Sequence, residues 1–115
     1  MASDCIFCRI AAGEAPAEIL YQDDEVTAFR DGRPAAPIHI LVIPNRHIAT
    51  INDADPEDAA LLGRLILTAK AMAEAQGVAE RGYRLVFNVG QEGGQSVYHI
   101  HLHLIGGARL PVFHH

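Results

Sequence analysis

The sequence lacks the features that define several classes of protein. No hydrophobic run in its 115 residues approaches the roughly 20 residues that a membrane-spanning helix needs. The first residues contain neither the basic segment nor the apolar segment of a secretory signal, so we expect a cytoplasmic protein without a membrane partner. Positive charge is also scarce. The formal net charge of −5 argues against nonspecific binding to nucleic acid.

Cysteine is scarce as well, because Cys5 and Cys8 are the only two. Without a secretion signal, this pair argues against a structural disulfide. A Cys-x-x-Cys pair is compatible with a redox pair, with half of a zinc site, or with two buried thiols. Internal repeats, low-complexity segments and linkers are also missing. We therefore expect one domain over residues 1–115, small enough that pairing with a second copy would stabilise it.

The order of apolar and turn-forming residues predicts an antiparallel α+β fold with five strands, a short helix and a long helix. The short helix covers residues 4–11 and begins near Asp4. The long helix runs from Pro56 to Gln76, with Asp55 as its N-cap and Gly77 as its C-cap. The predicted strands are Ile19–Tyr21, Val26–Arg30, His39–Ile43 (ended by Pro44), Tyr83–Val89 and Tyr98–Ile105.

The long helix carries a wide apolar stripe that includes Leu61, Leu65 and Met72. Such a stripe is compatible with a helix that faces only its own sheet. It is equally compatible with a helix that also contacts a second subunit.

Histidines alternate with apolar residues in the last predicted strand. Because successive side chains of a strand point to opposite faces, His99, His101 and His103 would lie on one surface, whereas Tyr98, Ile100, Leu102 and Leu104 would face the core. This spacing suits a metal, a nucleophile or both. The preceding Gly93-Gly94-Gln95-Ser96 segment offers a flexible backbone and hydrogen-bonding groups suited to a phosphate.

The segment His99-Ile100-His101-Leu102-His103-Leu104-Ile105 resembles the signature of the histidine triad superfamily of nucleotide hydrolases and transferases. Further segments resemble its branch of histidine triad nucleotide-binding proteins, in the same order and over about residues 4–107. These are Cys5–Ile10, Ala28–Asp31, His39–Pro44, His47, Asn88 and Gly93–His103. The resemblance implies the same α+β fold, with two subunits that join their sheets into a homodimer.

The resemblance also implies a division of roles among the polar residues. His101, in the middle of the triad, would attack the α-phosphorus of a nucleotide and form a nucleotidyl-histidine intermediate. His103 would donate a hydrogen bond, Ser96 would assist the leaving group, and His39 would support the triad. Gly94 and Asn88 would hold the phosphate oxygens, and Gln95 belongs to the same binding loop.

Asp31 is implied to bind the ribose hydroxyls, although the residues alone favour a turn aspartate before Gly32. Four apolar side chains are implied to enclose the base, although by themselves they fit an ordinary core: Ile6, Phe7, Ile10 and Phe29. Microbial members of the branch that resemble this chain place one structural zinc between two cysteines and two histidines. The matching residues here are Cys5, Cys8, His47 and His99.

The implied function is hydrolysis of purine nucleoside phosphoramidates to AMP or GMP and an amine. A dinucleoside polyphosphate hydrolase is the nearest alternative, since it would use the same triad with another leaving group. A third alternative is a nucleotide- or zinc-binding interaction protein with vestigial activity.

Overall fold

The structure is a computed structural model that describes residues 4–112. Five strands form one antiparallel sheet in the order β1-β2-β3-β5-β4, as the sequence predicted for the fold class. The strands are β1 Ile19–Gln22, β2 Val26–Arg30, β3 Ile38–Pro44, β4 Tyr83–Phe87 and β5 Leu102–Gly106. The helices are α1 Ile6–Ala11 and α2 Ala59–Ala75, together with the short 3₁₀ helices η1 Ile51–Asp53 and η2 Pro56–Asp58. Within residues 4–112, no helix is long and apolar enough to cross a membrane.

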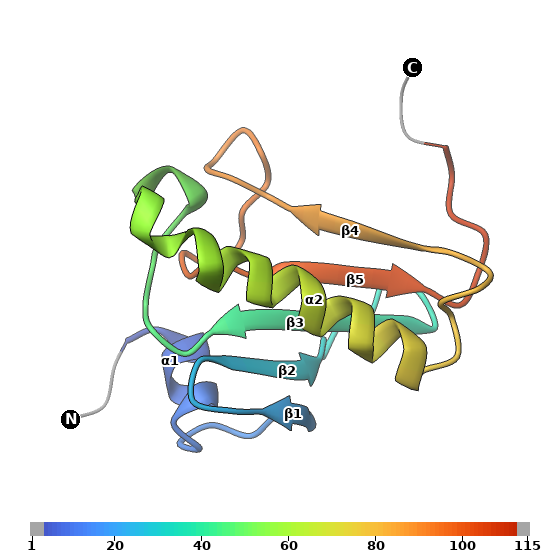
Figure 1. The fold of residues 1–115 in the computed structure, drawn as a ribbon, viewed down its shortest axis with the longest axis horizontal. Helices are drawn as coiled ribbons and strands as arrows, with labels where there is room; N and C mark the ends of the chain where they lie inside the picture. The colour runs from blue at the N-terminus through green and yellow to red at the C-terminus, as the bar shows by residue number, and fades with distance from the viewer. Residues whose placement is uncertain (1–3, 113–115) are drawn as a thin grey trace.

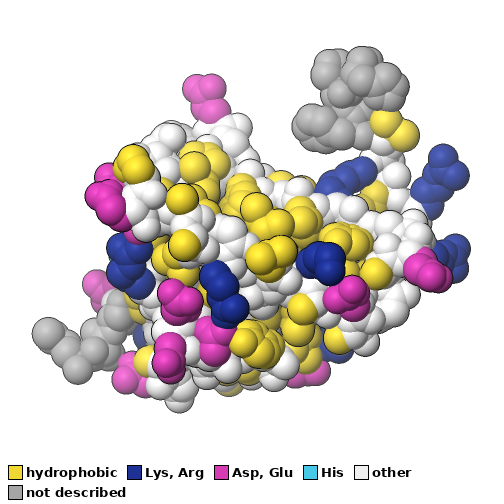
Figure 2. All heavy atoms as spheres, viewed as in Figure 1, with side chains coloured by type: hydrophobic (Ala, Val, Ile, Leu, Met, Phe, Trp, Pro, Cys, Tyr) yellow, Lys and Arg dark blue, Asp and Glu magenta, His cyan; other side chains and the backbone are white. Residues whose placement is uncertain are grey.

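The sheet buries both of its faces, each against a different helix. Helix α2 lies across one face (Figure 1), where it packs on Val26, Ile40 and Leu102. Helix α1 covers part of the other face, where Phe7 and Ile10 contact Phe29, Leu41 and Ile43. Because side chains alternate along a strand, one run of sequence supplies both layers. The α1 face also receives the histidines, and Figure 2 shows none on the α2 side of the described chain.

The last strand starts later than the sequence predicted. Only Leu102–Gly106 pairs with β3 and β4, so His99 and His101 lie before the strand. The apolar alternation nevertheless holds from Ile100 onward, where Ile100 is 2% exposed and Leu104 is fully buried. Tyr98, predicted to face the core, is 48% exposed. Residues 97–99 form bends, and the Ile100 N–H donates to the Ile48 carbonyl in the loop after β3 instead of to a neighbouring strand.

Several predicted boundaries also shift. Helix α1 begins after Cys5, whose Sγ accepts a hydrogen bond from the Cys8 main-chain N–H, so Asp4 is not its cap. The first turn of the long helix is the separate 3₁₀ helix η2, which Asp55 precedes as N-cap and whose Asp58 carboxylate accepts from the Asp55 N–H. Pro44 is the last residue of β3 instead of its terminator, and β4 ends two residues before Val89.

Candidate active site

A hollow of about 500 Å³ opens on the α1 face of the sheet, where α1, β2, β3 and the segment before β5 meet. It holds seven of the predicted site residues: Phe7, Ile10, Phe29, Asp31, Ser96, His101 and His103. The sequence analysis missed other lining residues, including Pro16, Ala17, Leu41 and Val97. Leu41 could have been found from its position, since it lies two residues after His39 on the same face of β3. Val97 lies within the Gly93–His103 segment that carries the resemblance, whereas no motif marks Pro16 or Ala17.

The hollow has an apolar end formed by aromatic and aliphatic side chains. The rings of Phe7 and Phe29 meet edge to face with centroids 5.5 Å apart, and Leu41 pairs with Phe29 in the sheet register. Phe7 also contacts the His101 ring at 5.1 Å, so the apolar end adjoins the histidines directly. Ile6 is 39% exposed and lines a neighbouring hollow with Cys5, Ser96 and Tyr98. It therefore lies apart from the other predicted base contacts.

His101 is held in one tautomer by its own chain. Its Nδ1 lies 2.9 Å from the carbonyl oxygen of His99, and a carbonyl only accepts hydrogen bonds. Nδ1 therefore carries the hydrogen, which leaves the lone pair on Nε2. Burial lowers the pKa of His101 and keeps the ring neutral at neutral pH. A neutral imidazole with a lone pair beside the hollow is competent to act as a nucleophile.

His39 and His103 form a second pair with a fixed direction. The main-chain N–H of Ala35 donates to His39 Nδ1 at 2.9 Å, so the single hydrogen of a neutral His39 is on Nε2. His39 Nε2 lies 2.8 Å from His103 Nδ1 and donates to it. His103 consequently carries its own hydrogen on Nε2. Burial, reinforced by His101 and His39, lowers the pKa of His103 to about 4, so this ring is also neutral at neutral pH.

Asp31 follows the last residue of β2 and lines the same hollow as the histidines. Its Oδ1 accepts the main-chain N–H of Arg33 at 2.8 Å, which is the turn role that the residues alone favoured. Its Oδ2 lies 3.4 Å from His39 Nε2. One carboxylate oxygen therefore closes the turn, while the other lies between the hollow and the His39–His103 pair.

The loop before the triad is held together by its own polar groups. The Gln95 side chain is 7% exposed; its amide nitrogen donates to the carbonyls of Ala49 and Val97, and its oxygen accepts from the Gly90 N–H. Asn88 donates to the Gly93 carbonyl, and the Gly94 N–H donates to the Gln91 carbonyl. Asn88, Gly94 and Gln95, which were predicted to bind the nucleotide, do not line the main hollow. The sequence analysis missed this loop-holding role, for which the residue types gave no signal.

Ser96 and Val97 follow this loop and do line the hollow. Their main-chain N–H groups donate to no protein acceptor in the described part of the chain. Ser96 is exposed, so its hydroxyl is accessible to solvent and to a bound molecule. The loop thus ends in two backbone donors and a hydroxyl beside the histidines.

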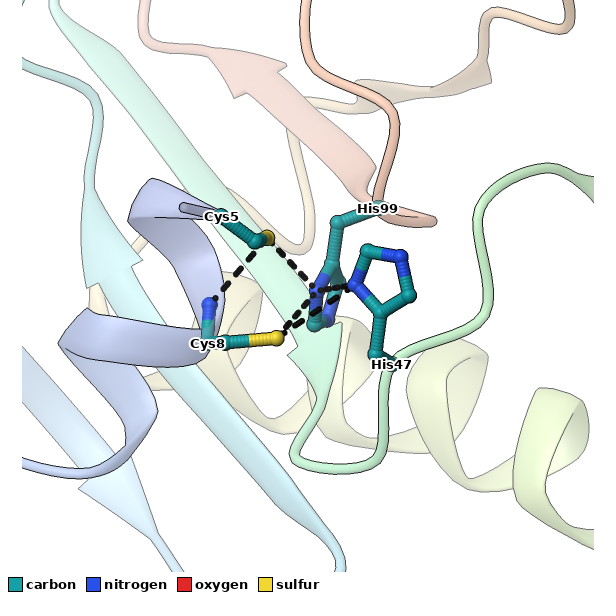
Figure 3. Close-up of side chains that lie close together, drawn as sticks. All are labelled: Cys5, Cys8, His47 and His99. Atoms are coloured by element: carbon teal, nitrogen blue, oxygen red, sulfur yellow. Dashed lines mark hydrogen bonds between the residues drawn. The ribbon is translucent and has the colours of Figure 1, made fainter. Parts of the chain in front are cut away.

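The four predicted metal ligands converge next to this site (Figure 3). The two sulfurs come from the start of α1, His47 from the loop after β3, and His99 from the segment before β5. His99 Nδ1 lies 3.3 Å from Cys5 Sγ, 3.5 Å from Cys8 Sγ and 3.3 Å from His47 Nδ1, and Cys8 Sγ lies 3.3 Å from His47 Nδ1. The cluster brings together ligand atoms able to hold a metal ion.

These spacings can be compared with those around a tetrahedral ion. Zinc bonds of about 2.0–2.1 Å to nitrogen and 2.3 Å to sulfur place two nitrogens about 3.3 Å apart and a nitrogen and a sulfur about 3.6 Å apart. The observed N···N distance of 3.3 Å equals the first value, and the N···S distances of 3.3–3.5 Å lie within about 0.3 Å of the second. His99 Nε2 donates to the Pro44 carbonyl at 2.8 Å, which turns the Nδ1 lone pair toward the cluster. Burial also lowers the pKa of His99, which favours the neutral ring that a metal requires.

Comparison with known proteins decides the family, since the HIT domain model matches residues 12–110. The chain belongs to the HIT family. It is 53% identical over 116 residues to the purine nucleoside phosphoramidase of Escherichia coli strain K12, a match that covers 100% of this chain and 98% of the relative. The predicted resemblance to histidine triad proteins is thereby confirmed.

Solved structures agree with this assignment. A HIT family hydrolase from Legionella pneumophila is 55% identical and superposes with a TM-score of 0.92, covering 94% of this chain and 96% of the other. A Zn-bound histidine triad family protein from Mycobacterium smegmatis is 34% identical with a TM-score of 0.77, covering 89% and 73%. The fold therefore agrees with that of the HIT family.

Proposed function

We propose that this HIT protein is a hydrolase that cleaves the P–N bond of purine nucleoside 5′-phosphoramidates, releasing AMP or GMP and an amine. Two findings support it: the full-length similarity to a purine nucleoside phosphoramidase, and the placement of a neutral His101 beside a hollow with an apolar end. The observation that carries the proposal is the His101 tautomer. A ring with its hydrogen on Nδ1 and its lone pair on Nε2 is ready to attack phosphorus.

The proposed reaction has two displacements. His101 Nε2 forms a bond to phosphorus, the P–N bond breaks, and its electron pair leaves with the amine, which takes a proton from water. A second water then attacks phosphorus, the bond to His101 Nε2 breaks with its electron pair returning to the ring, and the proton of that water is released. The two displacements together replace one difficult step with two easier ones.

Other residues would bind and orient the substrate. The base fits between Phe7, Ile10 and Phe29, and Asp31 accepts from the ribose hydroxyls. The N–H of His103 Nε2 and the main-chain amides of Ser96 and Val97 would donate to phosphate oxygens, and the Ser96 hydroxyl would assist the leaving group; their position along the hollow supports these roles. Asn88, Gly94 and Gln95 would act indirectly, by holding the loop that carries Ser96.

The test is to trap the intermediate. Rapid acid-free quenching of wild-type protein with an α-³²P-labelled adenosine phosphoramidate should leave label on His101, whereas His101→Ala should neither retain label nor turn over. AMP binding by His101→Ala, measured by calorimetry, controls for folding. Turnover by the wild type without any trapped nucleotidyl group would contradict the two-step mechanism. Faster AMP release from diadenosine tetraphosphate than from the phosphoramidate would favour the polyphosphate alternative.

We also propose that zinc occupies the cluster of Cys5, Cys8, His47 and His99, supported by its tetrahedral spacing and by the Zn-bound relative. Four protein ligands leave no position for a reacting water, so the metal would tie α1 to the sheet and supply no step of the reaction. His101 and His103 stay outside the ligand set.

A homodimer is proposed from the α2 face and the free edge of the sheet. Strand β4 is an edge strand of the sheet. On α2, Leu67 is 64% exposed and Ile66 is 45% exposed. Figure 2 shows hydrophobic side chains gathered over α2 on this face. Replacing Leu67 by Asp should shift the protein from dimer to monomer in sedimentation, while Glu14→Ala, at an exposed residue after α1, should not. A monomeric wild type would reject the dimer.

A further inference from the structure

We propose that the Asp31–Pro37 loop is a positioning device that makes His103 a hydrogen-bond donor, and that the main-chain N–H of Ala35 is its decisive group. Two distances define the device. Ala35 N lies 2.9 Å from His39 Nδ1, and His39 Nε2 lies 2.8 Å from His103 Nδ1. The first contact fixes which nitrogen of His39 carries hydrogen, and the second transmits that choice to His103.

The direction of this chain follows from what each atom can do. A main-chain N–H only donates, so it excludes the His39 tautomer that has its hydrogen on Nδ1. His39 Nε2 must then be the donor and His103 Nδ1 the acceptor. A neutral His103 consequently keeps its hydrogen on Nε2. With the opposite His39 tautomer, His103 Nδ1 would have to donate, and Nε2 would offer a lone pair to an anionic phosphate instead of a hydrogen.

The loop is tied to His39 at a second point, which keeps the Ala35 N–H in register. The Asp31 N–H donates to the His39 carbonyl at 2.9 Å, and the Asp31 carboxylate closes the turn through the Arg33 N–H. Asp31 Oδ2 is a second acceptor near His39 Nε2, but at 3.4 Å it is farther away than His103 Nδ1. The single hydrogen of His39 is therefore directed to His103.

Ala35 itself has no side chain that reaches the site, and its side chain is exposed, so side-chain substitutions there should be silent. Only loss of the N–H should matter, which proline achieves. Ala35→Gly keeps the N–H while loosening the loop. Ala36→Pro stiffens the same loop at a residue whose N–H donates to no acceptor in the described chain. These two variants are the matched controls.

The experiment has a readout that does not depend on turnover. Imidazole ¹⁵N spectra of the ligand-free wild type at pH 7 should show His39 protonated on Nε2 only, and His103 likewise. Ala35→Pro should populate both His39 tautomers. Wild-type His39 protonated on Nδ1 would overturn the proposal, whatever the fate of the variant.

The kinetic consequence rests on the proposed function. Ala35→Pro should lower kcat for an adenosine phosphoramidate by about 2- to 12-fold, the population change expected for loss of one hydrogen bond. Its affinity for AMP should fall by a similar factor, because His103 also donates to the phosphate of AMP, whereas its affinity for adenosine, which lacks the phosphate, should stay at the wild-type value. In Ala35→Gly and Ala36→Pro, kcat and both affinities should stay at the wild-type values. Equal kcat in Ala35→Pro and wild type, with the His39 tautomer shifted, would overturn the device. A wild type that cleaves no phosphoramidate would reject the proposed function and leave the spectral result standing.

Discussion

Individual histidines of one chain acquire different properties from the atom that contacts each ring. A carbonyl oxygen sets the tautomer of His101, and another carbonyl turns the His99 lone pair toward the metal cluster. At His39, the main-chain N–H of Ala35 donates to Nδ1, so the ring carries its hydrogen on Nε2 and donates it to His103. Because a neutral imidazole has one donor and one acceptor, a single fixed neighbour determines the function of the opposite nitrogen.

The low pKa of His103 predicts a pH-dependent stability. Folding lowers this pKa from 6.5 to about 4, mainly through burial, so the unfolded chain binds more protons between these values. The free energy of unfolding should therefore fall as the pH falls from about 6.5 to about 4, by up to about 3 kcal/mol, with no contribution above pH 7.

Urea denaturation of wild type and His103→Gln at pH 4.5 and pH 7 measures this contribution. The difference between the two pH values should be smaller in His103→Gln, which has no ring to protonate. Comparing the difference between proteins cancels the effect of acid on the metal cluster, which both share. An identical pH dependence in the two proteins would show that His103 does not titrate differently on unfolding.

The element that decides the site is the loop between β4 and β5. It connects two antiparallel strands and brings Ser96 and Val97 to the hollow that His101 also lines. Polar side chains that pack against the loop's own backbone hold its shape, chiefly the buried Gln95. Gly93 fits because its backbone approaches Val89 so closely that a Cβ would lie 2.3 Å from the Val89 oxygen.

Gly93→Ala should therefore destabilise the protein by about 1–3 kcal/mol, because the loop must shift to admit a methyl group. Thermal or urea unfolding of the purified variant measures the change. Gly32→Ala is the matched control, since an added Cβ there meets nothing within 4 Å and the backbone has no positive φ. It should stay within about 0.5 kcal/mol of wild type. Equal stability of the two variants would contradict the close approach.

At the scale of the whole molecule, the two faces of one sheet separate structure from chemistry. Helix α2 and its core stabilise one face of the sheet. Helix α1 covers part of the other face, where its Phe7 and Ile10 form the apolar wall of the hollow. Helix α1 is six residues long and too short to be stable alone, so its position depends on Phe7, Ile10 and the cluster of Cys5 and Cys8 with His47 and His99. A metal ion bound by this cluster would therefore stabilise the wall of the candidate base site.

Metal analysis should find about one zinc per chain. Removing the metal with a chelator, or replacing Cys5 and Cys8 by Ser, should lower the melting temperature by at least about 5 °C, equivalent to about 1 kcal/mol. The residual turnover rate should fall only as far as α1 loosens. Loss of the nucleotidyl intermediate from a protein that is still folded would instead place His99 in the reaction.

The sequence alone determined the fold class, four of the five strands to within two residues at each end, and the residues of the triad. Local patterns carry this information, because apolar alternation and turn residues act over a few neighbours. The resemblance of several ordered segments added the metal set, whose four ligand atoms the structure brings together. Function was predicted by the same resemblance and agrees with the family.

Only the tertiary structure decided where β5 begins and what each polar group contacts. His99 and His101 lie outside the strand because Ile100 bonds to Ile48, a partner far away in the chain. Gln95 and Asn88 hold the loop instead of lining the hollow. Ala35 fixes the His39 tautomer through its main-chain N–H, a group that every residue except proline has. Hydrogen-bond direction depends on neighbours brought together by folding, and residue types do not encode it.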